Sequence, residues 1–345
     1  MIYILEYIWL DAVGNSRSKT KVLNLENGIT LEKCPQWNYD GSSTGQATTE
    51  NSEVLLTPVK LYLDPFRKSE NAYLVLCETY QVNGLPHDTN SRYKARVIFD
   101  SSEDQKPMFG LEQEFFISKE NDEGEIIPIG FLNKKNCKEQ GDYYCGVGGN
   151  NVVGKQLIER AMDNLLYSNI SITGMNAEVA PSQWEFQVCD YGINAADDLI
   201  MLRYICNRTF EEEGLIMDIR AKPVKGDWNG SGCHINFSTE DMRKENGYSV
   251  IQSAISNLEN NHDLHIRNYG DDNSERLTGK HETSDMKTFS WGVGSRHTSI
   301  RIPNETEKKN CGYFEDRRPS SSLNPYSSTA LLFSTSVGIE QSFFV

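Results

Sequence analysis

The stretch Phe109-Gly-Leu-Glu-Gln-Glu-Phe-Phe-Ile117 places two carboxylates within an apolar run. The aromatic and branched residues around Glu112 and Glu114 predict a buried β-strand over residues 108–118. Successive side chains of a strand point to opposite faces, so these two glutamates share one face. Two unpaired carboxylates on a buried strand repel one another and are costly. A bound cation would remove that cost; the alternative for this motif is a solvated strand edge.

Further metal-ligand residues occur in three distant segments. Glu178 and Glu185 flank a Pro-Ser turn, His234 follows the glycine-rich run Asn229-Gly-Ser-Gly-Cys, and Glu315 lies in residues 313–320. Taken singly, glutamates near turns usually face solvent, and a lone histidine in an apolar run is usually a core residue. Taken together, five carboxylates and one imidazole suit hard divalent cations such as Mg²⁺ or Mn²⁺.

Five arginines gather near the end of the chain. The simplest explanation for any single one is an ion pair with an Asp or Glu of this acidic protein. Guanidinium groups bind carboxylate and phosphate through paired donors, so a cluster favours an anionic ligand. Metal ions beside arginines suggest phosphoryl chemistry. The cluster comprises Arg276, Arg296, Arg301, Arg317 and Arg318.

One motif points elsewhere and is rejected. Gly149-Asn-Asn-Val-Val-Gly-Lys155 resembles a phosphate-binding loop, but Gln156 stands where a magnesium-binding Ser or Thr is required. We expect a surface helix to begin at this point.

Composition limits the class of protein. The 345 residues are 38% hydrophobic and 24% charged, which is typical of a globular chain, and the net charge is −15. A surface this acidic argues against nucleic acid or an anionic membrane as a partner. Residues 1–10 predict a strand and not a signal peptide, and no apolar run reaches the ~18 residues of a membrane span. We therefore expect a cytoplasmic protein whose eight scattered cysteines are reduced thiols.

The chain changes character near residue 85. Before that point, strands are expected, and after it helices and strands alternate, which predicts an α+β fold with a small domain at residues 1–84 and a larger one at residues 91–345. The expected strands are residues 2–10, 20–25, 54–64, 73–82, 108–118, 183–188, 234–238 and 295–302. The expected helices are residues 91–102, 151–168, 195–213 and 248–261, after a linker at 86–90.

Eight segments in order resemble the glutamine synthetase family, in its eukaryotic-type (class II) branch. They are residues 37–46, 110–114, 143–148, 176–185, 226–234, 276–283, 295–303 and 313–320. The resemblance implies an N-terminal β-grasp domain and a catalytic domain with a curved antiparallel sheet and flanking helices, as in the glutamine synthetase/guanido kinase-like fold. It also implies a homo-oligomer, a decamer of two pentameric rings with active sites between subunits.

The resemblance assigns roles to individual residues. One metal would bind Glu114, Glu178 and Glu185, and the other Glu112, His234 and Glu315. The nucleotide set, which shares some metal ligands, is Glu112, Glu185, Asn236, Ser238, Arg296, Arg301, Tyr313 and Glu315. The substrate set is Asp227, Trp228, Asn229, Gly230, Arg276, Arg296 and Arg317. The catalytic set is Asp40, reaching in from the adjacent subunit, with Glu282 on a flap, Arg296 and Tyr143, the last in the ammonium pocket.

The implied activity is the ligation of ammonium to the side chain of L-glutamate. ATP and two or three Mg²⁺ or Mn²⁺ ions per site would be used, and γ-glutamyl phosphate would be the intermediate. Three alternatives stay open: a ligase for a larger amine, a non-catalytic scaffold that keeps the fold, and a two-metal hydrolase. One departure from the family is Cys189-Asp190, which stands where Gly-Pro is usual, near the nucleotide.

Overall fold

The computed structural model describes residues 1–26, 28–132, 137–339 and 344. The chain divides into two compact units, one formed by residues 1–97 with 162–170 and the other by residues 98–161 with 171–345.

The first unit is built on a five-stranded sheet with the order β2-β1-β5-β4-β3. β1 and β5 run parallel, and the other neighbours are antiparallel. Tyr3, Leu5, Tyr7 and Trp9 alternate along β1 and are buried in its core, which explains why this run forms a strand. The strands are β1 (Ile2–Leu10), β2 (Ser16–Asn24), β3 (Trp37–Asp40), β4 (Glu53–Leu63) and β5 (Ala72–Gln81). All four expected strands are present; β2 begins earlier than expected, and β3 was not expected.

The second unit contains a nine-stranded sheet. Its path is β12-β13-β14-β11-β6-β9-β8, and β7 and β10 also pair with β6; only the β12–β13 pair is parallel among these pairings of described strands. The strands are β6 (Met108–Glu120), β7 (Ile126–Pro128), β8 (Ile172–Ala177), β9 (Gln183–Tyr191), β10 (Ile216–Asp218), β11 (Cys233–Ser238), β12 (Trp291–Val293), β13 (Ile300–Ile302) and β14 (Phe314–Asp316).

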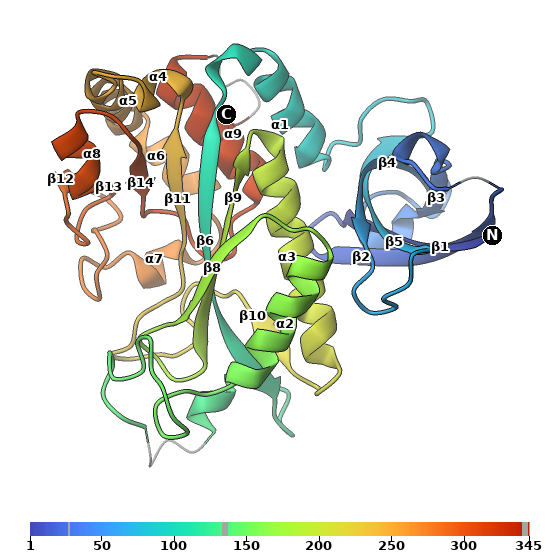
Figure 1. Cartoon of the computed structure of the whole chain (residues 1–345), viewed down its shortest axis with the longest axis horizontal. Helices are drawn as coiled ribbons and strands as arrows, with labels where there is room; N and C mark the ends of the chain where they lie inside the picture. Colours follow the sequence, from blue (N-terminus) through green and yellow to red (C-terminus); the bar gives the residue numbers. More distant parts are fainter. Residues whose placement is uncertain (27, 133–136, 340–343, 345) are drawn as a thin grey trace. The chain divides into compact units, whose positions relative to one another are not determined.

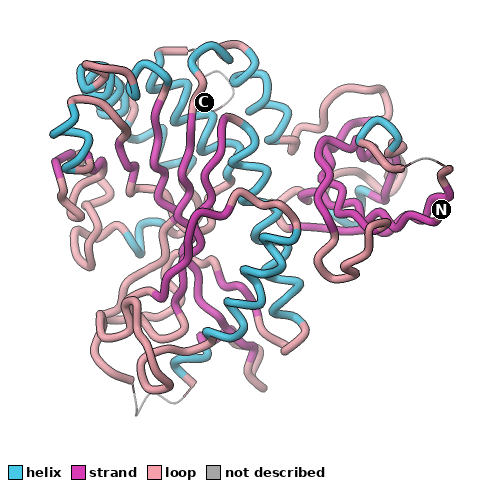
Figure 2. Tube along the Cα trace, in the orientation of Figure 1, coloured by secondary structure: helices cyan, strands magenta, loops and turns pink. Residues whose placement is uncertain are grey.

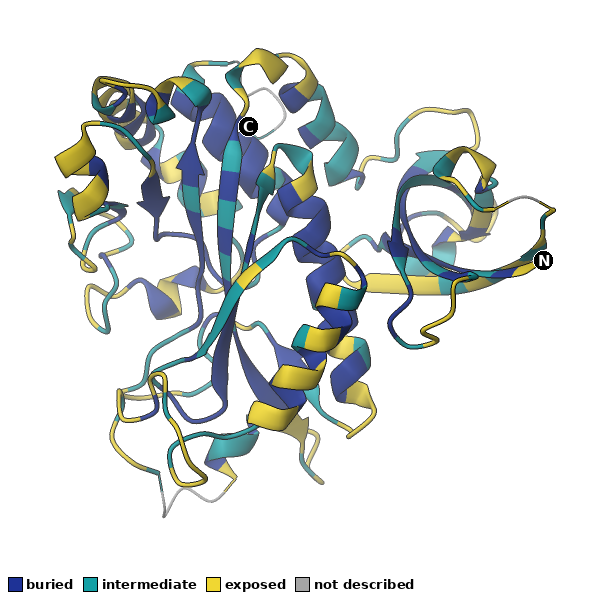
Figure 3. Ribbon diagram, viewed as in Figure 1, coloured by how far each residue is buried: buried dark blue, intermediate teal, exposed yellow. Residues whose placement is uncertain are grey.

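Helices cover one face of this larger sheet. α3 packs against β6 and β9, and α9 packs against α3, α5 and α6 (Figures 1 and 2). α3 and α9 are largely buried, as Figure 3 shows. The helices are α1 (Ser91–Asp100), α2 (Lys155–Tyr167), α3 (Ile193–Glu211), α4 (Glu240–Arg243), α5 (Tyr248–Asn260), α6 (His262–Asn268), α7 (Asn273–Arg276), α8 (Asn304–Lys309) and α9 (Pro325–Val337).

The central strand β6 separates the core from the site. Leu111, Gln113 and Phe115 are fully buried, and the intervening positions are partly open. The Phe115 ring lies 6.0 Å from the tilted ring of Phe210 in α3, measured between ring centroids, so the odd positions face the helices. The two glutamates of β6 therefore project from the opposite face, as the alternation predicts.

One helix and one strand differ from their expected ranges. The expected surface helix begins at Lys155, directly after Gly154 with φ +86°, so the start at residue 151 in the expected range 151–168 is wrong. The expected strand over residues 295–302 is wrong in its first part, because only Ile300–Ile302 pairs as β13. The Thr298 hydroxyl donates to the carbonyl oxygen of Ser295 (3.1 Å), which closes a turn there. No helix in the described parts of the chain is long and apolar enough to cross a membrane.

Candidate active site

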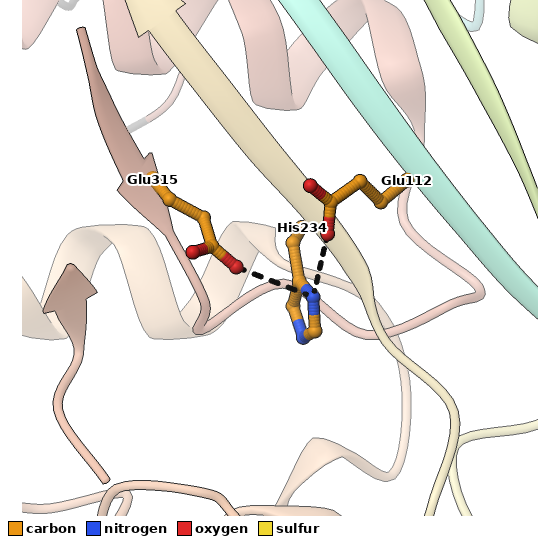
Figure 4. A group of neighbouring side chains, drawn as sticks. All are labelled: Glu112, His234 and Glu315. Atoms are coloured by element: carbon orange, nitrogen blue, oxygen red, sulfur yellow. Dashed lines mark hydrogen bonds and ion pairs between the residues drawn. The ribbon is translucent and has the colours of Figure 1, made fainter. Parts of the chain in front are cut away.

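Three neighbouring strands bring the first group of metal-ligand residues together. Glu112 on β6 lies opposite His234 on β11, and Glu315 comes from β14, the next strand along. The imidazole Nδ1 is 3.3 Å from a Glu112 oxygen and 3.6 Å from a Glu315 oxygen (Figure 4). One ligand atom from each residue lies within 4.8 Å of the others, a spacing that a single ion could span.

A second group forms from the adjacent strands. Glu114 on β6 is directly paired with Glu185 on β9, so both side chains emerge at one place. Glu178 joins them because the chain turns sharply between β8 and β9, where Ser182 has φ +62° and the Glu178 N–H donates to the Gln183 carbonyl (2.9 Å). These three carboxylates also place ligand atoms within 4.8 Å of one another.

The second group carries an electrostatic cost. Burial raises the pKa of Glu178 and Glu185 well above the ordinary carboxyl range, and neighbouring carboxylates raise both further. Burial also raises the pKa of Glu114, although Arg276 and the N–H of Gly232 oppose the rise. A divalent cation would offset this repulsion and supply the missing positive charge, so the oxygen-rich groups fit Mg²⁺ or Mn²⁺.

Arginines line the same cavity. Arg317 Nη1 is 2.5 Å and Arg301 Nη1 is 3.1 Å from different oxygens of Glu315. The Nε atoms of both arginines are buried and have no hydrogen-bond partner in the described part of the protein. A buried unpaired donor is costly, so these atoms suit a ligand with acceptor oxygens. Arg318 points the other way: it is fully buried and pairs with Asp316 (2.7 Å).

Two cavities meet at the carboxylates. The first, of about 180 Å³, is polar and is lined by all six metal-ligand candidates together with Arg276, Arg296, Arg301 and Arg317. The second, of about 490 Å³, is mainly apolar and shares Glu112 with the first. Its lining includes Val188, Phe237 and Tyr313. A charged chamber opening beside an apolar one suits a ligand with an anionic group at one end and a flat apolar group at the other.

Comparison with known proteins identifies the family. The model for the glutamine synthetase catalytic domain matches residues 89–258, and the model for the glutamine synthetase beta-Grasp domain matches residues 1–82. The chain belongs to the glutamine synthetase family. A putative glutamine synthetase of Acanthamoeba polyphaga mimivirus is 46% identical, over 97% of this chain and 94% of the relative. A glutamine synthetase of Neurospora crassa is 47% identical, over 97% of this chain and 92% of the relative.

A solved structure confirms the fold. The cryo-EM structure of Plasmodium falciparum glutamine synthetase matches with a TM-score of 0.78 at 18% identity, over 97% of this chain and 72% of that chain. The expected α+β fold, with a β-grasp N-terminal domain and a helix-flanked sheet, is therefore confirmed.

Several residues that the glutamine synthetase resemblance singles out also reach the cavities. Asn229 and Gly230 line the polar cavity, as do Glu282 and Arg296, whose charged groups lie 3.1 Å apart. Asn236, Ser238 and Tyr313 line the apolar one. Their roles in glutamine synthetase chemistry remain predictions.

Other expected residues lie elsewhere. Trp228 packs edge-on against Phe131 at 4.9 Å between ring centroids, and the Asp227 carboxylate faces His281 (3.3 Å). Neither lines the polar cavity. Tyr143 is buried, and its hydroxyl accepts a hydrogen bond from the Lys138 N–H (2.8 Å).

Some residues that line the polar cavity were not expected from the sequence. Tyr144, next to the expected Tyr143, lines the polar cavity together with Arg296. Asn176, Gln187 and His281 also line it. The adjacent tyrosines were a signal, but nothing in the sequence showed which one faces the site.

Asp40 belongs to the first unit. Its carboxylate accepts hydrogen bonds from the hydroxyls of Ser42 (2.6 Å) and Ser43 (3.0 Å) and from the Ser42 N–H (3.0 Å). These bonds lower the pKa of Asp40, which is solvent-exposed and ionised at neutral pH.

Proposed function

We propose that this protein is an ATP-dependent glutamate–ammonia ligase that makes glutamine, ADP and phosphate through γ-glutamyl phosphate. The observation that carries the proposal is the polar cavity, where two trios of metal-ligand residues face four arginines in a chain of the glutamine synthetase family. A binding protein without chemistry has no need for such a costly cluster of buried carboxylates.

Each group of residues has a place in the proposed reaction. Of the two or three Mg²⁺ or Mn²⁺ ions per site, Glu114, Glu178 and Glu185 would hold one, and Glu112, His234 and Glu315 another. When bound, these ions neutralise phosphate charge. Asn236, Ser238 and Tyr313, with Glu112, Glu185 and Glu315 beside the phosphates, would bind ATP.

The arginines orient the two anionic substrates. Arg296 and Arg301 would bind the phosphates of ATP, and Arg276 and Arg317 the carboxylates of glutamate, with Asn229 and Gly230 against its backbone. Arg296 would also stabilise the charge that develops on the transferring phosphoryl group. The glutamate γ-carboxylate attacks the γ-phosphorus, and ADP leaves.

The second half of the reaction needs a base. Ammonium has no lone pair, so Asp40 of an adjacent subunit would take one proton before nitrogen attacks the acyl phosphate. The carbon–oxygen bond to phosphate then breaks, and the surplus proton on the new amide leaves with phosphate as HPO4²⁻. Glu282 would close over the site, attract the cation and exclude water. Tyr144 suits the ammonium pocket better than the expected Tyr143, because Tyr144 lines the cavity.

The remaining expectations form part of the proposal. The protein would be a homo-oligomer, a decamer of two pentameric rings, and would divide at residues 1–84 and 91–345. We place it in the cytoplasm because relatives from Daucus carota and Pinus sylvestris are named cytosolic isozymes of glutamine synthetase.

The test is the stoichiometry of the reaction. Purified protein is given Mg²⁺, ATP, glutamate and ammonium, and glutamine and phosphate are measured together. The expected result is one phosphate per glutamine, with loss of both products in Glu315→Ala and loss of glutamine in Asp40→Ala. A larger amine that gives a higher kcat/KM than ammonium would replace ammonium as the substrate. ATP hydrolysis unaffected by glutamate and ammonium would refute the ligase.

A further inference from the structure

The loop of residues 279–283, which we call the flap, has an unusual backbone. His281 (φ +54°) and Glu282 (φ +61°) are consecutive non-glycine residues in the left-handed region. Side chains disfavour this conformation, which persists only where surrounding contacts hold it. The contacts of these two residues therefore help to hold the flap in place.

Three contacts of His281 and Glu282 tie the flap to other elements, and the Thr283 hydroxyl also donates to the Arg276 carbonyl (3.1 Å). The Glu282 carboxylate pairs with Arg296 (3.1 Å), and the Glu282 carbonyl accepts a hydrogen bond from Arg317 Nη2 (3.3 Å). His281 Nε2 lies 3.3 Å from Oδ1 of Asp227, on a different loop. Both His281 and Glu282 line the polar cavity.

The first two ties compete with substrates. In the proposed function Arg296 binds phosphate and Arg317 binds glutamate. Once those anions are bound, each guanidinium group interacts with both its substrate and Glu282. Asp227 does not line the polar cavity, and its contact with His281 uses neither of the guanidinium groups that the substrates need. Of the three ties, the Asp227 contact is the one that can persist unchanged through the reaction.

The loop that carries Asp227 is held in place by hydrogen bonds and packing. Asn229, two residues after Asp227, is held by Gln140 through two hydrogen bonds: its N–H donates to Gln140 Oε1 (2.5 Å), and Gln140 Nε2 donates to its side-chain oxygen (2.7 Å). Between them, the Trp228 ring packs on Phe131, and the Trp228 carbonyl accepts a bond from Lys222. Asp227 thus extends from an anchored segment toward the flap.

We propose that His281 and Asp227 form a latch that positions Glu282 over the polar cavity while substrates occupy the arginines. This inference rests on the proposed function and makes both latch residues positioning residues. Loss of the latch lets the flap open more often, so water reaches the acyl phosphate and ammonium is held less well. Because the Asp227 side chain is fully exposed, the latch shifts the flap equilibrium by up to about fivefold.

The test is a double-mutant cycle. His281→Ala, Asp227→Ala and the double variant are compared with Lys280→Ala, which changes an exposed flap residue outside the latch. The ratio of phosphate released to glutamine formed, and the KM for ammonium, are measured for each. Both single variants should raise these values about two- to fivefold, and the double variant should match the singles, because residues that act only as a pair are not additive. Asp227→Asn, which keeps an acceptor oxygen, should fall between. Unchanged ratios, or additive effects, would overturn the latch.

A second measurement does not depend on catalysis. Hydrogen exchange of the flap amides in substrate-free protein should quicken in both latch variants and stay at the wild-type rate in Lys280→Ala. The Asn229 amide should keep its rate, since Gln140 still holds it. If the wild type makes no glutamine, the proposed function fails, yet faster flap exchange would still support the latch and unchanged exchange would still refute it.

Discussion

Replacing Glu185 by glutamine separates two effects of the carboxylate cluster: the loss of stability from buried negative charge, and the binding of metal. Glu185 is 6% exposed, and Gln187 donates a hydrogen bond to its Oε1 (2.7 Å). Burial, followed by repulsion from Glu112, Glu114 and Glu178, raises its pKa to about 9. Glutamine has the shape of the protonated form and is neutral at every pH, so the metal-free variant should fold as well as the wild type near pH 6.5.

The pH dependence follows from proton uptake. An unfolded glutamate loses its proton near pH 4.3, whereas folded Glu185 keeps its proton until about pH 9. Between these values the folded state binds more protons, so the stability of the metal-free protein falls as pH rises. One such group contributes about 1.4 kcal/mol per pH unit, or about 3 kcal/mol between pH 6.5 and 8.5. Glu185→Gln removes this contribution.

The assay is thermal unfolding at pH 6.5, 7.5 and 8.5, with and without Mn²⁺. At about 2 °C per kcal/mol, the wild-type Tm without metal should fall by roughly 6 °C more than that of Glu185→Gln across this range. Mn²⁺ at a hundredfold excess over Kd should stabilise the wild type by about 2.7 kcal/mol, and the variant should lose most of that gain. Glu120→Gln, at the exposed end of β6, is the control. A variant that keeps both the pH slope and the full response to Mn²⁺ would refute the reasoning.

Three further substitutions have expected outcomes. Tyr269→Phe removes a buried hydroxyl that donates to a carboxylate at 2.8 Å and contacts an imidazole at 2.6 Å; urea unfolding should show a loss of about 1–3 kcal/mol, and an unchanged midpoint would contradict this. Tyr144→Phe should raise the KM for ammonium severalfold, while Tyr143→Phe should mainly lower the free energy of unfolding, by about 1 kcal/mol. If kinetics and thermal unfolding gave the reverse pattern, the roles proposed for the two tyrosines would be wrong. Gly130→Ala would place a Cβ 2.6 Å from Pro181, and Pro181 lies in the turn that presents the second group of metal ligands. Calorimetry should show Mn²⁺ binding weakened at least tenfold. An affinity equal to that of the wild type would show that the turn adapts to the added methyl group.

Periodic segments of the fold could be predicted from the sequence. The run around β6 alternates, and α2 and α5 have apolar residues at helical spacing, so pattern and structure agree. α9 was missed because it is buried nearly all round and has no polar face to reveal its period. Asn324 and Pro325 did mark its start, since the asparagine side chain caps the helix. β3 was missed because it has only four residues.

The candidate site could be predicted in part. Residue type and resemblance predict the six metal-ligand candidates, and the structure brings them together in two groups because they lie on adjacent strands or on the turn between them. The contact between His281 and Asp227 could not be predicted, because it depends on how two loops 54 positions apart meet. Whether Tyr143 or Tyr144 faces the cavity depends on the path of an irregular loop, which no period describes.

The alternation along β6 also limits which changes in chain length the protein can accept. Deleting or inserting one residue near Gly110 would reverse the direction of every side chain that follows in the strand. Glu112 and Glu114 would then enter the helix-covered core, and Phe115 would enter the polar cavity. Neighbouring strands β9 and β11 obey the same rule, because their residues are paired with β6 position by position. Variation in length should therefore be tolerated in exposed turns such as residues 121–125, and hardly at all in the central strands.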